Sequence, residues 1–367
     1  RLRLPNRSSR STVASIVMLA LLTLAETATL AAANPPTGVT IDSADAQSLQ
    51  EPGDPSSPRV SVISTTELGL PLYCPFGVAF YRDDAMWIVE YDGGRLLRYS
   101  PGVGCEIMAG SSQPGYVDGP GHQARFNKLH NLVIARDGMI YMSDHQNHAV
   151  RSFDPATGQV ATLVGSGKPG FAGDNDANAK IEFRQPISIT LTPDHAALMI
   201  ADIQNRRIRR FDLTTRTITT VAGTGSKGVP ADNAIAASSP LVDPRAIAFD
   251  SQGNLYLAER GGHALRLIED GRIRTVAGTG EPGRNDGPPS QARFRGPKHL
   301  ETDPQGRVYI ADDMNDLIRV FDPVTATVST LDTSPYELNR PHGVTWHDGE
   351  LYIADSFNHR IIKVNAP

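Results

Sequence analysis

Cysteine, aromatic residues and helical hydrophobic patterns are all scarce in this chain. Only two of the 367 residues are cysteine and 6% are aromatic, which excludes a small fold held together mainly by disulfides. No stretch shows the apolar spacing of an amphipathic helix over more than two or three turns, so a helical bundle is excluded. The formal net charge is −5, and the basic residues form no stripe interleaved with aromatic residues. A nucleic-acid-binding surface is therefore not expected.

Long hydrophobic runs are also missing. The longest apolar stretch, residues 13–25, follows an arginine-rich start and precedes the Ala-rich residues 30–33, and it is too short to span a bilayer comfortably. This order predicts a secretory signal peptide over residues 1–33, with a retained membrane anchor as the alternative. Residues 34–58 are rich in Pro, Ser and acids, which predicts a disordered spacer. We therefore expect a secreted or periplasmic protein with no membrane span after signal removal.

One sequence unit is repeated six times in the rest of the chain. Residues 309–322 (YIADDMNDLIRVFD) return almost unchanged as 352–365 (YIADSFNHRIIKVN), and four fainter copies precede them. The copies carry an acid at Glu90, Asp144, Asp202, Glu259, Asp312 and Asp355. Each unit has four short runs of alternating apolar residues, separated by turns that contain Gly or Asp, which predicts four strands. Repeats of this kind predict an all-β, six-bladed β-propeller.

The sixth unit contains only three of the four strands. Residues 59–68 (RVSVISTTEL) have the composition of a strand and precede the first unit. Because an unpaired strand edge favours aggregation, we expect this segment to complete the last blade and close the ring. The alternative is a ring with an incomplete last blade. The predicted propeller covers residues 59–367.

The repeated pattern resembles the NHL repeat. It consists of P-x-G-[VI]-A, then LY[IV]AD-x-x-N-x-x-[IL]-R-x-[FV]-D, then [TV]VAG, over about residues 60–367. The resemblance implies a six-bladed propeller of NHL-type repeats. It implies little about activity, because one propeller fold carries many unrelated functions. We expect a monomeric binding module for an envelope or extracellular protein, peptide or glycan, and an enzyme is not favoured.

The first residue of each inner strand is expected to lie beside the propeller axis. In chain order these residues are Phe76, His130, Ile187, Arg245, Lys298 and His342. Four of them are cationic or can gain a proton, namely His130, Arg245, Lys298 and His342. Arg245 offers a planar fork for a carboxylate or a phosphate. The four residues predict a site for a small anionic or polar ligand at the channel mouth, with ion pairs to acids of neighbouring connections as the alternative.

A local resemblance also exists to the peptidylglycine-amidating lyases, NHL-type propellers with zinc-binding histidines in P-H-G or P-H-S contexts. Pro341-His342-Gly343 matches that context and Leu129-His130-Asn131 matches it in part, but Arg245 stands where a third ligand would be needed. Arginine has no lone pair to donate, and a catalytic zinc normally has three protein ligands. No cofactor or metal is therefore predicted. The alternative function is a metal-dependent lyase or hydrolase of the cell envelope that uses His130 and His342 as zinc ligands.

Four acids in the long connections between blades are candidates for calcium binding. They are Asp118, Asp176, Asp232 and Asp286, and each precedes an Ala-rich run that ends in Phe126, Phe183, Leu241 or Phe294. A calcium loop would show several acids at alternating positions, so we interpret these acids as caps of short helices. The apolar residues that follow are expected to anchor the connections. The recurring Asp with an Asn three residues later, as in Asp144 and Asn147, is interpreted as a turn-forming pair.

The two cysteines are expected at opposite edges of the first blade. Cys74 precedes its innermost strand and Cys105 begins its outermost strand. Three strand spacings of about 4.8 Å exceed the Cα separation of about 7 Å that a disulfide allows. Although export would permit a disulfide, we expect two free thiols.

Overall fold

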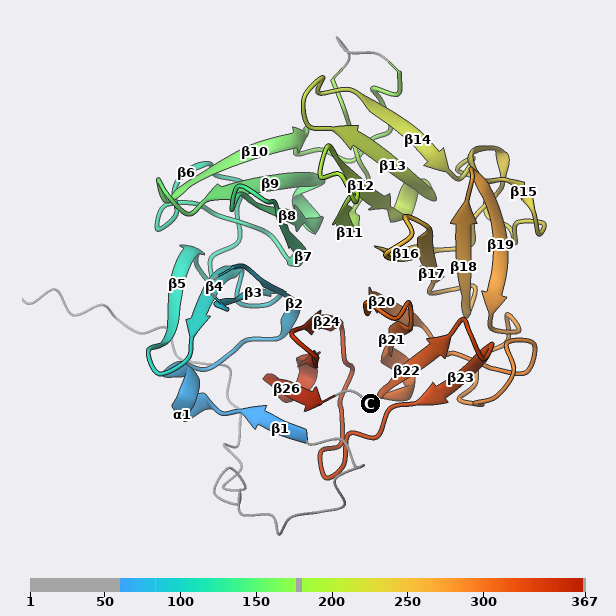
Figure 1. The fold of residues 1–367 in the computed structure, drawn as a ribbon. Helices are drawn as coiled ribbons and strands as arrows, with labels where there is room; N and C mark the ends of the chain where they lie inside the picture. The colour runs from blue at the N-terminus through green and yellow to red at the C-terminus, as the bar shows by residue number, and fades with distance from the viewer. Residues whose placement is uncertain (1–59, 83, 176–179, 366–367) are drawn as a thin grey trace, which may run out of the picture. The chain divides into compact units, whose positions relative to one another are not determined.

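Six antiparallel sheets surround a central axis in the computed structural model of this chain (Figure 1). The structure describes residues 60–365, apart from residue 83 and residues 176–179. Each sheet forms one blade, with its innermost strand beside the axis and its outermost strand at the rim. The prediction of an all-β, six-bladed propeller is confirmed. The predicted signal peptide (1–33) and spacer (34–58) lie outside the described residues.

The strands of the first five blades follow the chain from the axis outward. Blade one contains β2 (Pro75–Phe80), β3 (Met86–Glu90), β4 (Arg95–Ser100) and β5 (Gly104–Gly110). Blade two contains β7 (Leu129–Ile134), β8 (Ile140–Asp144), β9 (Ala149–Asp154) and β10 (Gln159–Gly165). Blade three contains β11 (Pro186–Leu191), β12 (Ala197–Asp202), β13 (Arg207–Asp212) and β14 (Ile218–Ala222). Blade four contains β16 (Pro244–Phe249), β17 (Leu255–Glu259), β18 (Ala264–Glu269) and β19 (Arg272–Ala277). Blade five contains β20 (Pro297–Thr302), β21 (Val308–Asp312), β22 (Leu317–Asp322) and β23 (Thr327–Thr330).

Blades two and four each have an additional outer strand. The two-residue strand β6 (Gly119–Pro120) pairs with β10, and β15 (Ala234–Ile235) pairs with β19. Each lies in the connection that precedes its blade. None of the helices in the described part of the chain has the length and apolar content to cross a bilayer.

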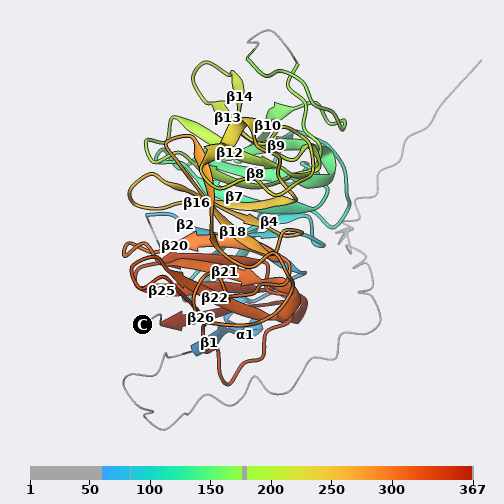
Figure 2. The ribbon, with the colours of Figure 1, turned by 90° about the vertical axis from the view of Figure 1, so that its right-hand side faces the viewer.

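Blade six is completed by a strand from the N-terminal side of the chain. From axis to rim it contains β24 (Gly343–His347), β25 (Glu350–Asp355), β26 (Arg360–Asn365) and β1 (Val60–Ile63). In both ribbon views β1 lies beside β26 (Figure 1, Figure 2), and Val60 is paired with Val364 in antiparallel register. The expected closure of the ring is confirmed.

Only the first half of the segment 59–68 is a strand. Residues Thr65–Leu68 form the short helix α1, and Ser64 is its N-cap. Glu67 N–H donates to Ser64 Oγ and Ser64 N–H donates to Glu67 Oε2. This Ser-x-x-Glu capping box satisfies N–H groups at the start of the helix, which is why the strand prediction fails after Ile63.

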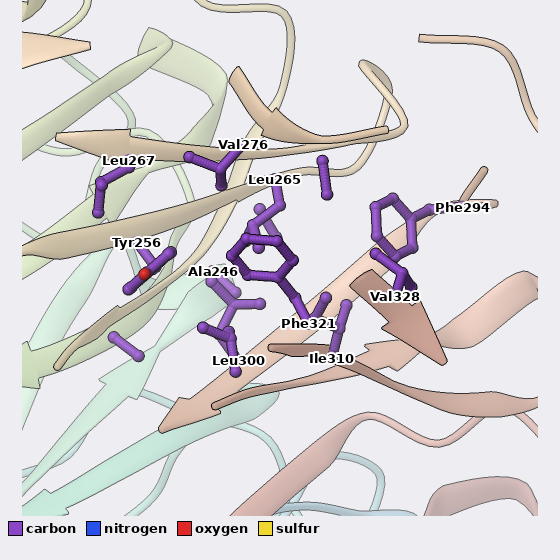
Figure 3. Packing of buried hydrophobic residues seen from close by; sticks show 14 of the residues in the cluster. Ala246, Tyr256, Leu265, Leu267, Val276, Phe294, Leu300, Ile310, Phe321 and Val328 are labelled. Atoms are coloured by element: carbon purple, nitrogen blue, oxygen red, sulfur yellow. The ribbon is translucent and has the colours of Figure 1, made fainter. Parts of the chain in front are cut away.

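The hydrophobic core lies between adjacent blades. Figure 3 shows the cluster between blades four and five, in which Leu265 of β18 packs with Phe321 of β22 and Ile310 of β21. Phe294 joins this cluster from the connection between the two blades. The corresponding residues of the other connections, Phe126, Phe183 and Leu241, are also fully buried. The predicted anchoring of the connections is confirmed.

Asp118 and Asp286 bind arginines of the third strands and Asp232 binds a backbone N–H, so the interpretation of these three acids as helix caps is wrong. The corresponding ion pairs are Asp118 with Arg151 at 2.5 Å, Asp174 with Arg209 at 2.7 Å, and Asp286 with Arg319 at 2.5 Å. In the third connection the pairing acid is therefore Asp174, and Asp176 lies outside the described residues. Asp232 accepts a hydrogen bond from the N–H of Thr275 at 2.7 Å. Each acid lies against the next blade because a buried guanidinium or a free N–H of that blade needs an acceptor.

The turn-forming pair is confirmed in the four repeats that carry Asn, whereas the repeats of blades one and four have Gly at that position. Asn147 Nδ2 donates to Asp144 Oδ2 at 2.8 Å, and the N–H of Asn127 donates to Asp144 Oδ1 at 2.8 Å. Arg151, whose side chain is fully buried, also donates to Asp144 Oδ2 at 2.8 Å. The repeat acid therefore connects the turn, the preceding connection and the third strand of its own blade.

Cys74 and Cys105 are free thiols, as expected. Burial raises the pKa of each to about 12. Both are therefore protonated at neutral pH, and a protonated thiol is a poor nucleophile.

Candidate functional site

The structure brings four residues of the inner strands together at the channel mouth. His130 lies in β7, Arg245 in β16 and Lys298 in β20, and His342 directly precedes β24. Arg245 Nη2 lies 3.0 Å from His130 Nε2, and Lys298 Nζ lies 2.6 Å from His342 Nε2. The two imidazole rings have centroids 6.5 Å apart. We call these four residues the mouth cluster.

The two histidines are neutral acceptors that orient the two cations. His342 Nδ1 donates to the carbonyl of Arg340 at 2.7 Å, so its Nε2 has the free lone pair that accepts from Lys298. Burial, together with the nearby Lys298, holds the pKa of His342 well below its usual range. Burial and the neighbouring Arg245 do the same for the pKa of His130. The histidines therefore add no positive charge at neutral pH.

The two cations keep their charge at neutral pH but are partly desolvated. Burial lowers the pKa of Lys298 to about 8, although Asp313 opposes this shift. Burial and the neighbouring Arg260 lower the pKa of Arg245 to about 10. In surroundings of low dielectric constant, each cation interacts more strongly with an anion than it would in water.

Sequence reasoning missed a second ring of residues around the mouth. These residues directly follow the repeat acids and are Tyr91, His145, Ile203, Arg260, Asp313 and Ser356. The fully buried Asp313 carboxylate lies 2.9 Å from Lys298 Nζ and 2.7 Å from Arg340 Nη2. These residues could have been found from their position, because each directly follows the recurring acid of its unit. The residue type at this position differs from unit to unit, so no sequence pattern marks it.

Ion pairing with acids, the alternative reading of the mouth, applies to Lys298 but not to Arg245. Lys298 and Arg340 share Asp313. Arg245 makes no ion pair with any residue in the described ranges, and its buried Nε has no hydrogen-bond partner there. His130 Nδ1 is likewise buried without a partner among the described residues. Unsatisfied buried donors are costly, but the Nε atoms of the ion-paired Arg151 and Arg319 are unpartnered as well. The feature that distinguishes Arg245 from them is therefore its missing ion pair.

One wall of the mouth is aromatic. The ring of Phe76 stacks on His342 with centroids 3.8 Å apart and on Tyr91 with centroids 4.2 Å apart. Phe357, about half exposed, stacks on the other side of His342 at 6.0 Å. The mouth therefore presents apolar ring faces beside two cations.

The arrangement does not favour a metal centre at His130 and His342. In the part of the chain that the structure describes, no group of three or more His, Cys, Asp or Glu residues is placed to hold a metal ion. The Nε2 lone pair of each of these histidines already faces Lys298 or Arg245. A metal ion bound there would have to displace one cation and would be repelled by the other.

Comparison with known proteins supports the repeat assignment. No family model matches the chain. The chain is 26% identical to NHL repeat-containing protein 2 of Homo sapiens, over 76% of this chain and 44% of the relative. It is also 26% identical to Protein SUPPRESSOR OF QUENCHING 1, chloroplastic, of Arabidopsis thaliana, over 59% of this chain and 27% of the relative. The chain thus spans less than half the length of these curated relatives.

Solved structures with the same fold have varied functions. An auxiliary nutrient binding protein from Bacteroides thetaiotaomicron has a TM-score of 0.59 and 15% identity, over 80% of this chain and 69% of that chain. Virginiamycin B lyase from Staphylococcus aureus has a TM-score of 0.55 and 14% identity, over 85% of this chain and 100% of that chain. At such identities the likeness shows the fold alone. The six repeated units, the six closed blades and the NHL repeat-containing relatives together identify this chain as an NHL-repeat β-propeller.

Proposed function

We propose that this chain is an exported binding module that takes a small anionic ligand at the mouth cluster. The observation that carries this proposal is Arg245, whose guanidinium has no ion pair and whose buried Nε has no hydrogen-bond partner among the described residues. A planar guanidinium suits a carboxylate or a phosphate. A carboxylated sugar, a peptide or a phosphate of the cell envelope or extracellular space fits this chemistry, and the signal-like N-terminal sequence is the reason to place the protein there.

The charge balance of the mouth supports an anion. Asp313 is shared between Lys298 and Arg340, so one carboxylate serves two cations. Arg245 adds a further positive charge without a counter-ion in the described residues. Phe357, which is about half exposed, offers its ring for an apolar part of the same ligand. The solved nutrient binding protein shows that this fold is compatible with a binding role, whereas the orientation of the two histidines toward cations disfavours the metal-dependent lyase or hydrolase.

Replacing Arg245 with Met is expected to weaken anion binding by roughly thirtyfold, because it removes the buried cation while retaining much of the side-chain volume. Isothermal titration calorimetry with carboxylated sugars, peptides and phosphates measures the change. Arg274→Ala is the matched control, since Arg274 lies on the outer strand β19 and is half exposed. Equal affinity of the wild type and the Arg245→Met variant would remove the proposal.

Binding of a carboxylate is expected to weaken by about tenfold between pH 7 and pH 9. The pKa of Lys298 lies at about 8, so the lysine loses its proton, and with it the attraction to the anion, within this interval. The ligand carboxylate stays ionised throughout, and the pKa values of both histidines are too low for them to titrate there. Calorimetry at half-unit pH steps gives the profile.

The matched variant for this profile is Lys298→Arg. Arginine has a higher pKa than lysine, and even Arg245 in this mouth has a pKa of about 10, so the variant should bind with a nearly constant affinity over the same range. A wild-type profile that is flat, or a variant profile that falls as steeply as the wild type, would show that Lys298 does not contribute its charge to binding.

A further inference from the structure

A side-chain acceptor joins neighbouring blades at four of the six junctions. The residue after the turn asparagine, or after the equivalent turn residue, accepts a hydrogen bond from the N–H group just before the next inner strand. The pairs are His148 with Gln185 at 3.0 Å, His263 with Gly296 at 3.2 Å, Asp316 with Arg340 at 2.8 Å and His359 with Cys74 at 3.0 Å. This inter-blade hydrogen bond is therefore a regular part of the repeat.

The junction between blades three and four departs from this rule. Arg206 occupies the acceptor position of blade three, and a guanidinium has no acceptor atom. The facing residue is Asp243, directly before β16. Asp243 does not have a positive φ, whereas the facing residue at each of the other five junctions does. The values are 56° at Cys74, 67° at Lys128, 60° at Gln185, 70° at Gly296 and 51° at Arg340. The blade three–four junction thus lacks both the acceptor side chain and the positive φ. The blade one–two junction lacks only the acceptor, because Gly94 has no side chain, and its facing residue Lys128 keeps the positive φ.

A pocket of about 190 Å³ opens at this junction. Its lining includes Ile203 and Gln204 of the short helix η3 (Ile203–Asn205), together with Arg206, Lys227 and Asp243. One water occupies about 30 Å³ of liquid volume, so a carboxylate or a phosphate with a small substituent fits. The pocket lies where the inter-blade hydrogen bond is missing.

The charges that line the pocket favour an anion. Arg206 Nε is buried and has no hydrogen-bond partner within the described ranges. Lys227 is exposed and adds a second cation from the connection to blade four. The carboxylate of Asp243 lies 4.0 Å from Arg260, so it is shared with a cation outside the pocket lining. Two cations therefore face a pocket with one acid that is already paired.

We propose that this pocket binds a small oxyanion, a carboxylate or a phosphate, through Arg206 and Lys227. The pocket borders the ring of residues around the mouth at Ile203, but its lining includes no residue of the mouth cluster, and the proposal does not rest on the function proposed above. Where the repeat normally places an acceptor for the next blade, this unit places a donor for a ligand. A local departure from an otherwise consistent repeat is the kind of position at which function is expected.

Calorimetric titration of the full chain with inorganic phosphate and with succinate, at a constant ionic strength of about 0.1 M, tests the site. The Arg245→Met variant is titrated as well, because weaker binding at the mouth cluster makes a second binding event easier to resolve. We expect one binding event to remain, for phosphate, for succinate or for both. Adding Arg206→His, which introduces the residue found at three other junctions, should weaken this event at least tenfold, and Lys227→Ala should weaken it about threefold.

Several results would overturn the proposal. One is the absence of any heat of binding in the Arg245→Met variant at about 20 mM of either anion; another is an affinity unchanged by Arg206→His. If Arg206→His fails to fold, Lys227→Ala decides the matter, because Lys227 is exposed and its removal leaves the core intact; unchanged affinity in that variant rejects the site. Arg274→Ala should bind as the parent does. An Arg245→Met variant that binds both anions as tightly as the wild type, while Arg206→His weakens one event, would refute only the function proposed for Arg245.

Discussion

Replacing Arg319 with Ala is expected to lower the free energy of unfolding by about 3–5 kcal/mol. The Arg319 side chain is fully buried, and Nη1 lies 3.1 Å from Asp312 Oδ2. Nη2 lies 2.5 Å from Asp286 and also donates to the carbonyl of Asn285 at 2.8 Å. Without the guanidinium, Asp312 becomes a buried and uncompensated carboxylate, and the connection between blades four and five loses its attachment to β22.

The measurement is the thermal and urea-induced unfolding of the variant, with Arg274→Ala as the control. Arg274 is half exposed and lies 4.0 Å from Glu269, so its loss should change stability by about 0.5 kcal/mol or less. Adding Asp312→Asn to Arg319→Ala should restore part of the loss, because the buried charge is then removed as well.

The defect of Arg319→Ala should also shrink as the pH falls. Burial already raises the pKa of Asp312 in the wild type, and loss of the arginine raises it further. A protonated Asp312 has no charge to compensate, so the difference from the wild type is largest at neutral pH and smaller near pH 5. A loss below about 1 kcal/mol at neutral pH, or one that grows on acidification, would contradict this account.

Replacing Val60–Ile63 with Gly-Ser-Gly-Ser is expected to lower the melting temperature by about 5–15 °C and to cause concentration-dependent association. Strand β1 pairs with β26 along its whole length. The side chains of Val60, Val62 and Ile63 pack into the clusters on either side of blade six. Losing them removes about 3–5 kcal/mol of hydrophobic stabilisation, and the unpaired edge of β26 becomes available to a second chain.

The matched control is the replacement of β15 (Ala234–Ile235) with Gly-Ser. Strand β15 is a fifth strand beside β19, on a blade that already has four strands, and Ile235 is more than half exposed. This control should melt within about 3 °C of the wild type and stay monomeric in sedimentation experiments. Equal behaviour of the two replacements would show that β1 does not hold the ring closed.

The mouth cluster could be found from the sequence because the repeat fixes its geometry. Every inner strand begins at the same point of the repeat, so the residues at that point must meet around the axis. The same logic would have found Asp313, which follows the repeat acid Asp312. The pattern of the repeat does not reveal it, because the acid recurs in every unit whereas the type of residue that follows the acid differs from unit to unit.

The charge states at the mouth were not predictable from residue types. His130 and His342 are ordinary titratable histidines in the sequence, yet burial and the adjacent cations hold the pKa of each well below its usual range. Lys298 acquires a pKa of about 8 because folding buries it near Arg245, and the opposing effect of Asp313 only partly offsets this shift. Such shifts depend on residues from different blades, separated by more than forty positions in the chain.

The sequence by itself determined the architecture of this protein. Six copies of one strand pattern can bury their apolar faces only against each other, which dictates a ring of blades, and the missing fourth strand of the last copy required the segment near Val60. The tertiary structure alone decided which acids meet which arginines, as for Asp286 and Arg319, and that the blade three–four junction opens where Arg206 replaces an acceptor. The physical reason is that strand periodicity is a local property of the chain, whereas ion pairs, desolvation and pockets arise between segments that only the closed ring brings together.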